Sequence, residues 1–268
     1  MNVQFEKNTF KKRLKSMIFV DFRRMFTSPL FYIMLGVSLV IPILILVMTT
    51  MMDGTVSTNP QTGEQTVIEG FKNVWQIIGT VSGGEAAAMS MDITSMCNIN
   101  MMFFIIAVFV CIFVADDFRS GYAKNLFTVR ARKDDYVVSK SLVCFVAGAS
   151  MIVLFFVGSM IGGAFAGLPF DLEGVTAGNI ALSVISKILL VGIFVAIYLL
   201  ASVVAKQRLW LSLVLSFGIG MLFFTMIPII TPLNSTIVNL ILCLVGSGIF
   251  ATGIGIGSSF ILKKTSLV

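Results

Sequence analysis

The residues that could do chemistry in this sequence are concentrated in one charged stretch, residues 116–140, which separates two long apolar runs. Its cations alternate with carboxylates: Arg119, Lys124, Arg130, Arg132, Lys133 and Lys140 are interleaved with Asp116, Asp117, Asp134 and Asp135. An Arg or Lys at the centre of a bilayer costs about 2.5–3.5 kcal/mol. We therefore expect the chain to leave a membrane here and then re-enter it. Such a mixed-charge surface suits contact with a second protein or with lipid head groups.

The rest of the sequence offers little for catalysis or for metal binding. It contains no histidine, which removes the commonest general base and the commonest zinc ligand. Its four cysteines have no paired metal-ligand spacing and are expected to be small buried apolar residues: Cys97, Cys111, Cys144 and Cys243. No phosphate-binding loop of the G-x-x-x-x-G-K-[ST] type occurs. We predict that this chain has no catalytic residue, no metal and no cofactor of its own, and is not an enzyme.

The composition predicts an all-α polytopic membrane protein. The 268 residues are 57% hydrophobic and only 12% charged, whereas soluble domains are about one-quarter charged. A helix needs about 20 residues to cross hydrocarbon, and six apolar runs approach or exceed that length. We predict transmembrane helices at residues 30–52, 99–115, 141–168, 180–204, 209–230 and 237–262. The first is expected to be retained, since no signal-peptide cleavage pattern follows it.

Residues 1–29 form a separate basic segment, ahead of a six-span domain at 30–268. One helical arc of this segment is apolar, and it comprises Phe10, Leu14, Met17, Ile18, Phe22 and Met25. Asp21 falls on this arc, and Ser28-Pro29 should end the helix. We predict an amphipathic helix that lies in the membrane interface. The alternative is a basic tail that only sets orientation.

The positive charges define the expected orientation. Of the 19 Lys and Arg residues, 17 lie in residues 1–29, 116–140, 205–208 and 263–268, and such loops face the cytoplasm. We predict a multi-pass plasma-membrane protein with both termini inside and a long outer loop at 53–98. Residues 67–79 of that loop are expected to form a short amphipathic helix, and residues 228–236 to dip back into the outer leaflet with their backbone buried in protein. Lys187, inside the fourth span, is expected to snorkel outward, with a cation lining an outer cavity as the alternative.

The order of residues after Val114 is similar to that of a known family. Asp117 supplies an acidic residue at the end of the second span, Gly121 follows after a short gap, and a short helical segment comes next. This pattern, with the six spans and both ends inside, resembles the type-2 permease family of ATP-binding-cassette exporters. Tyr122 stands where that family usually has Thr, and Asp117 where Glu is commoner.

The resemblance implies a working unit of two permeases and two ATPases, in which the cytoplasmic loop docks as a coupling helix into a groove on the separate ATPase. ATP and magnesium would be bound by that partner. The second permease would be another copy or a homologue, and no nucleic acid is involved. We expect apolar anchors and a charged rim at Asp117, Phe118, Arg119, Gly121, Tyr122, Lys124, Leu126, Phe127, Arg130 and Arg132. The alternative is an ordinary solvated loop at the lipid head groups.

The resemblance also implies a substrate path between the two permeases. We assign this path to Met101, Phe104, Lys187, Met221 and Phe224. Small residues on the fifth span, Ser212, Ser216 and Gly220, are expected at the dimer interface, with packing inside one chain as the alternative.

The apolar Met and Phe candidates favour amphipathic cargo. We predict export of membrane-active peptides or lipid-like drugs, and hence resistance to antimicrobial peptides. The alternatives are an exporter subunit for lipid-linked polysaccharide and a non-transporting binding, immunity or assembly protein. A small secondary carrier is disfavoured because no span has a central carboxylate.

Overall fold

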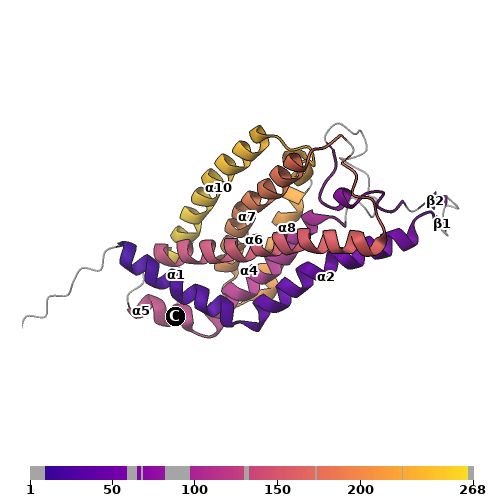
Figure 1. Cartoon of the computed structure of the whole chain (residues 1–268). Helices are drawn as coiled ribbons and strands as arrows, with labels where there is room; N and C mark the ends of the chain where they lie inside the picture. Colours follow the sequence, from indigo (N-terminus) through magenta and orange to yellow (C-terminus); the bar gives the residue numbers. More distant parts are fainter. Residues whose placement is uncertain are drawn as a thin grey trace, which may run out of the picture.

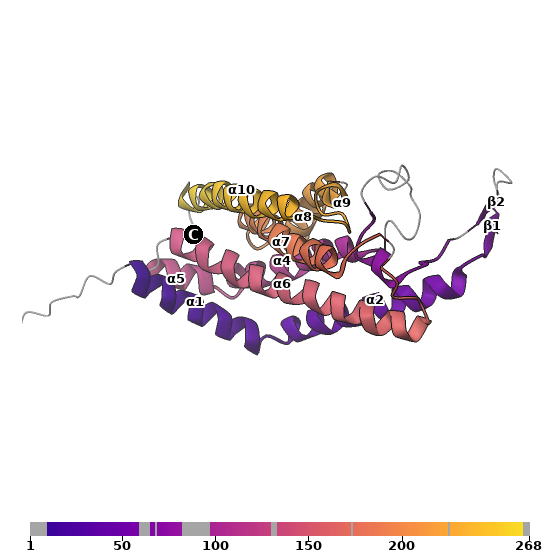
Figure 2. The same cartoon turned by 45° about the horizontal axis from the view of Figure 1, so that its top comes forward.

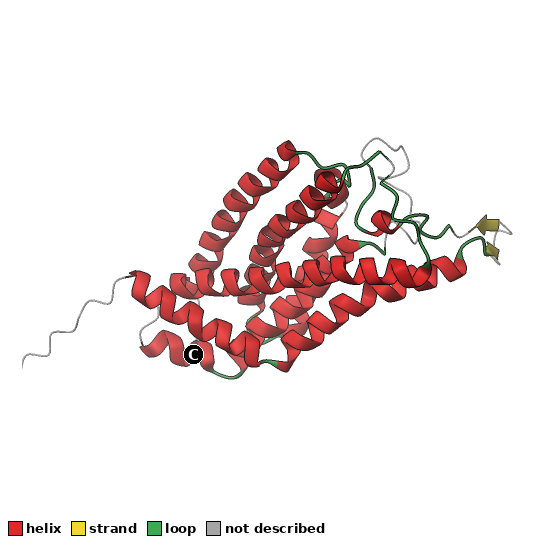
Figure 3. Cartoon of the chain, in the orientation of Figure 1, coloured by secondary structure: helices red, strands yellow, loops and turns green. Residues whose placement is uncertain are grey.

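The computed structural model describes residues 10–58, 65–67, 69–81, 97–129, 133–172, 174–224 and 226–264. Within these ranges the fold confirms an all-α polytopic membrane protein (Figures 1 and 3). Five helices are long and apolar enough to cross a membrane: α2 (Pro29–Met52), α4 with its preceding 3-10 turn (Ile99–Arg119), α6 (Lys133–Ala166), α7 (Ala177–Ala205) and α10 (Ile237–Lys264). The shorter apolar helix α8 (Leu209–Phe224) has 16 residues.

Helices α4 and α7 form the centre of the bundle, and α10 lies at its edge. In the most apolar stretch of α4 and of α7, about 67% of the residues are buried, compared with 6% in the corresponding stretch of α10. Helix α10 packs against α7 and α6 and leaves most of its surface uncovered, as Figure 2 shows.

The N-terminal helix α1 (Phe10–Thr27) packs along α6. It ends as expected before Ser28, whose extended backbone leads into Pro29 at the start of α2. Met17 and Met25, on the predicted apolar arc, are buried. This arc therefore rests on protein, which a purely interfacial helix would not require.

Helix α6 begins at Lys133, earlier than the predicted start of the third span at 141. Its 34 residues extend about 51 Å at 1.5 Å per residue, well beyond the ~30 Å of hydrocarbon. Asp134 and Asp135 occupy its first turn, where carboxylates stabilise a helix N-terminus. The extra turns carry charged residues. They project α6 into the group of elements that we call the basic end: α1, α5 (Tyr122–Val129), the loop 206–208 and the end of α10.

Glycines allow α2 and α6 to pack closely. A Cβ atom added at Gly158 would clash with the carbonyl oxygen of Leu39, and one added at Gly162 would lie 2.7 Å from the Cα of Ile43. The small-residue spacing in the third span thus serves packing inside one chain.

The predicted fifth span is interrupted. Helix α8 ends at Phe224, and the four-residue helix α9 (Ile227–Ile230) follows with Pro228 in its first turn. The next residues are irregular yet buried, including Thr231 and Leu233. The backbone N–H of Leu233 donates to the carbonyl oxygen of Thr80 at 2.8 Å. The expectation that this loop is buried in protein is confirmed.

The loop that was expected to form a helix at 67–79 adopts another structure. A small antiparallel hairpin, β1 (Val56–Thr58) and β2 (Gln65–Val67), extends from the end of α2 (Figure 1). The only helical turn described within 67–79 is the 3-10 helix η1 (Val74–Ile77). The ring N–H of Trp75 donates to the carbonyl oxygen of Phe170 at 3.0 Å. The apolar residues of this loop are therefore used to attach it to the bundle.

Candidate functional site

A short helix follows the second span at the place where the resemblance implies one. Helix α5 (Tyr122–Val129) is joined to α4 by a tight turn. Gly121 has a φ of +75° in this turn, a conformation that glycine adopts without strain. The backbone N–H of Ser120 donates to Asp116, and that of Asn125 donates to Gly121. The direction of α5 relative to α4 is therefore fixed by the backbone.

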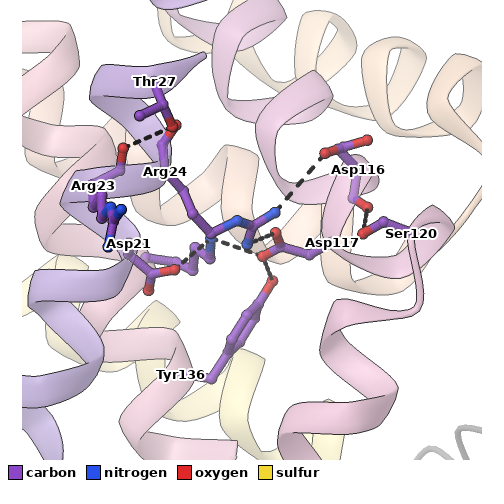
Figure 4. A network of polar contacts seen from close by, with 9 residues as sticks. Asp21, Arg23, Arg24, Thr27, Asp116, Asp117, Ser120 and Tyr136 are labelled. Carbon is purple, nitrogen blue, oxygen red and sulfur yellow. Dashed lines mark hydrogen bonds and ion pairs between the residues drawn. The ribbon is translucent and has the colours of Figure 1, made fainter.

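Behind this turn lies a group of buried charged side chains that sequence reasoning did not bring together (Figure 4). We call Asp21, Arg24, Asp117, Tyr136 and Lys140 the charge cluster. The Asp117 carboxylate contacts Arg24 at 2.5 Å, and it also contacts Lys140 and the Tyr136 hydroxyl, each at 2.8 Å. Lys140 also pairs with Asp21 at 2.9 Å. The cluster joins α1, α4 and α6.

The charges in this cluster balance. Asp21, Asp117 and Lys140 have no exposed side-chain surface, and Arg24 is only partly exposed. Two carboxylates face two cations, so each buried charge has a partner. Loss of one member would leave a buried charge uncompensated, which is far more costly than loss of a surface ion pair.

Helix α5 is attached to the same cluster. The guanidinium of Arg24 lies 4.0 Å from the centre of the Tyr122 ring, a cation–π geometry. Burial, and to a smaller extent the negative charges of Asp21 and Asp117, raise the pKa of the Tyr122 hydroxyl. Tyr122 therefore stays neutral at physiological pH, and its ring packs against the Arg24 guanidinium.

The aromatic residues proposed as anchors for the ATPase contact this chain instead. Phe118 is only 7% exposed, and the rings of Phe118 and Phe127 lie edge-on to Tyr136, with centroids 6.4 and 5.4 Å away. Leu126 is half-buried and packs on the core. These contacts hold α5 to the bundle, because an eight-residue helix is too short to be stable alone. The role of these residues as anchors for an ATPase stays a prediction.

The surface that α5 leaves free is polar. Lys124, Asn125 and Thr128 are exposed on the helix, and Arg119 is exposed just before it. Arg130 and Arg132 lie outside the described residues. The structure therefore separates the predicted coupling residues into an inward apolar set and an outward polar set.

The first turn of α6 adds further links at the basic end. Asp135 pairs with Arg13 of α1 at 3.3 Å, and Asp134 pairs with Lys263 of α10 at 2.7 Å. The amino group of Lys133 donates to the carbonyl oxygen of Leu262 at 2.5 Å. The start of α6 thus contacts both the N-terminal helix and the last span.

Two residues of the predicted substrate path meet in the structure. The Phe104 ring on α4 lies 5.3 Å from the Phe224 ring on α8, measured between centroids. Met101 is half-buried and Met221 is 58% exposed. The expected snorkelling of Lys187 is wrong, because its amino group is fully buried and donates to both oxygens of Thr231.

The hydrogen bonds to Thr231 measure 2.9 Å to the backbone oxygen and 2.7 Å to the hydroxyl. Lys187 therefore attaches α7 to the buried segment after α9.

The predicted dimer residues pack inside the chain. Ser212 hydrogen-bonds to Ser202 at 2.7 Å, and Ser216 contacts Cys111 at 3.1 Å. Gly220 lies against the ring of Tyr198. Both serines are fully buried, so this face of α8 cannot meet a second permease, and the assignment to a dimer interface is wrong.

Sequence reasoning missed Arg24, Tyr136 and Lys140 as site residues. One signal was visible: Asp21 interrupts an otherwise apolar arc, and a buried carboxylate requires a cation. Lys140 stands at the predicted edge of a span, where a long side chain is usually taken to reach water. Only the packing of α1 on α6 shows that these two residues face each other.

Comparison with known proteins agrees with this architecture. A family model described as ABC-2 family transporter protein matches residues 23–228. The match covers more than half of the chain, and the protein therefore belongs to the ABC-2 transporter permease family. No curated protein and no solved structure matched the chain in these comparisons. The family makes this chain a membrane-spanning transport subunit.

Proposed function

We propose that the chain is the permease subunit of an ATP-driven exporter, and that α5 transmits the movement of a separate ATPase to the spans. The observation that supports this proposal is the way in which α5 packs against the bundle. Its apolar side is held by Phe118, Phe127 and Tyr136, and its polar side faces outward. A helix held in this way can move the bundle when force is applied to its free side.

The proposal includes the orientation. The basic end contains α5, the loop 206–208 and the end of α10, and it would face the cytoplasm by the positive-inside rule. Both termini would then lie inside. An ATPase that supplies ATP and magnesium could reach α5 only from that side.

The cargo that fits best is amphipathic, such as a membrane-active peptide or a lipid-like drug. Phe104 and Phe224 form an aromatic pair between α4 and α8, and Met221 is exposed on the same helix as Phe224. Aromatic and Met side chains adapt to varied apolar shapes. Export of such cargo would protect a cell against membrane-active peptides.

The test is to place a bulky ring on the free side of α5. Asn125→Trp and Thr128→Trp should each reduce the amount of ATPase that co-purifies with the full-length permease, and also the ATP hydrolysis of the complex. Interface hot spots cost about 2 kcal/mol or more, so we expect a loss of at least about tenfold. Thr27→Trp, at an exposed threonine of the same end, is the matched control.

Unchanged melting temperatures must accompany the loss, because both α5 positions are exposed. If both α5 variants co-purify with the ATPase and turn over ATP like the parent, α5 is not the docking element. If no ATPase co-purifies even with the parent chain, the proposal of an ATP-driven exporter fails as a whole.

A further inference from the structure

A cavity of about 620 Å³ lies at the basic end, between the α4–α5 turn and the loop that joins α7 to α8. Its lining combines cations with apolar side chains, among them Phe118, Arg119, Lys124, Lys206, Arg208 and Leu211. Two segments about 80 residues apart in the sequence meet here. This cavity is distinct from the charge cluster, none of whose members lines it.

The charge of this lining is unbalanced. It contains Arg119, Lys124, Lys206 and Arg208 and no carboxylate. None of the four forms an ion pair with any part of the chain that the structure describes. Lys140 and Lys263, also at this end, each have a carboxylate partner within 3 Å. The cavity therefore concentrates positive charge that the fold does not neutralise.

The lining also contains apolar side chains. Phe118 and Leu211 contribute to the cavity, and Trp210, which precedes Leu211 in α8, is 64% exposed. Tryptophan is enriched at the depth of lipid head groups. Cations beside apolar surface at this depth match a ligand with an anionic head and a hydrocarbon tail.

The loop that supplies half of the cations has a fixed conformation. Lys206 has a positive φ of +53°, which is unusual for a residue with a side chain. Its backbone N–H donates to Ser202 at 2.8 Å, and that of Arg208 donates to Ala205 at 3.1 Å. The tight turn places both Lys206 and Arg208 in the lining of this cavity, despite the unfavourable φ of Lys206.

We propose that this cavity binds the phosphate head group of an anionic phospholipid from the adjoining leaflet, with its acyl chains along α8 near Trp210. Arg and Lys donate strong, charge-assisted hydrogen bonds to phosphate oxygens, and basic pockets between transmembrane helices recognise anionic head groups. An acidic protein segment would satisfy the cations but not the apolar side chains of Phe118 and Leu211 in the same lining. The proposal does not depend on the presence of an ATPase.

Trp210 can report the binding directly. The sequence has two tryptophans, so Trp75→Phe leaves Trp210 as the single tryptophan in the full-length protein. The permease is reconstituted in bilayers of phosphatidylcholine with an equal mole fraction of brominated phosphatidylglycerol or brominated phosphatidylcholine. We expect the anionic lipid to quench Trp210 more strongly, with a local enrichment of about fivefold or more.

The variant Lys206→Gln/Arg208→Gln should reduce this enrichment to about one, because it removes two of the four cations. Arg23→Gln/Lys264→Gln makes the same charge change at exposed residues of the same end and should retain the preference. Measuring Trp210 quenching in both double variants distinguishes the effect of a local binding site from the effect of the overall charge of the protein.

Four outcomes would overturn the proposal. Equal quenching by the two lipids, or equal loss in both double variants, would show that no local site exists. Loss of the preference on addition of millimolar inorganic phosphate would assign the cavity to a soluble phosphate. If Lys206→Gln/Arg208→Gln lowers the amount of co-purified ATPase but leaves the lipid preference intact, the cavity binds an acidic protein partner.

Discussion

Replacement of Asp117 by asparagine tests the charge cluster most directly. Asparagine keeps the shape of the side chain, and its oxygen can still accept the hydrogen bond from Tyr136. The change leaves Arg24 and Lys140 with Asp21 as the remaining carboxylate of the cluster. Removal of one partner from a buried ion pair costs about 3–5 kcal/mol, and we expect a loss of stability in that range.

The adjacent carboxylate provides a matched control. Asp116 lies 3.9 Å from the same guanidinium of Arg24, and its side chain is 67% exposed. Exposed ion pairs contribute about 0.2–1 kcal/mol. Asp116→Asn therefore makes the same change of charge one residue away and should have little effect on stability.

The measurement is thermal unfolding of the purified permease in detergent. For soluble domains of roughly 150–250 residues, a loss of about 3–5 kcal/mol corresponds to a fall in Tm of about 6–20 °C. Asp117→Asn/Lys140→Met restores the balance between Asp21 and Arg24 and should recover part of that loss. If Asp117→Asn melts at the same temperature as Asp116→Asn, the cluster does not stabilise the fold and the reasoning is refuted.

Two further predictions follow from packing. Gly158→Ala should lower Tm because its Cβ would clash with Leu39. Gly253→Ala is the control: its Cβ would have no atom of another element within 4 Å, so Tm should stay unchanged or rise. Equal shifts of Tm in the two variants would contradict the packing of α2 on α6. Ser216→Phe should lower the stability by about 1–3 kcal/mol or more, because it overfills a buried site, and should leave the oligomeric state seen by light scattering unchanged. Val214→Phe, at an exposed position of the same helix, should be neutral. Dissociation of a dimer by the Ser216 variant alone would restore the interface that the structure argues against.

The fold could be predicted from the sequence because hydrocarbon imposes simple requirements. Long apolar runs must be helical and charged stretches must lie outside them, and this was enough to locate all five longer spans. The start of α6 was misplaced because Lys140 looks like a boundary when its partners are unknown. The end of α8 was misplaced because Pro228 can either continue an apolar run or begin a new turn.

The site was harder to predict because its key contacts are long-range. Sequence spacing placed a short helix after Gly121, but it could not show which side of that helix contacts the bundle. Phe118 and Phe127 look equally suited to an external groove and to the ring of Tyr136. The pairing of Asp117 with Arg24 spans 93 positions in the sequence, and no local pattern reveals it.

The same carboxylate gives α5 its mechanical connection. Asp117 lies in the last turn of α4, next to the turn that begins α5, and it contacts α1 and α6 through buried partners. Displacement of α5 must therefore move α1, α4 and α6 together or break costly buried contacts. By contrast, α10 is joined to the start of α6 by the pair Asp134–Lys263, whose side chains are about half exposed, and by the hydrogen bond from Lys133 to the carbonyl oxygen of Leu262. Breaking these contacts costs less than separating the fully buried charges. Relative movement at the basic end should therefore occur between α10 and the group that carries α5.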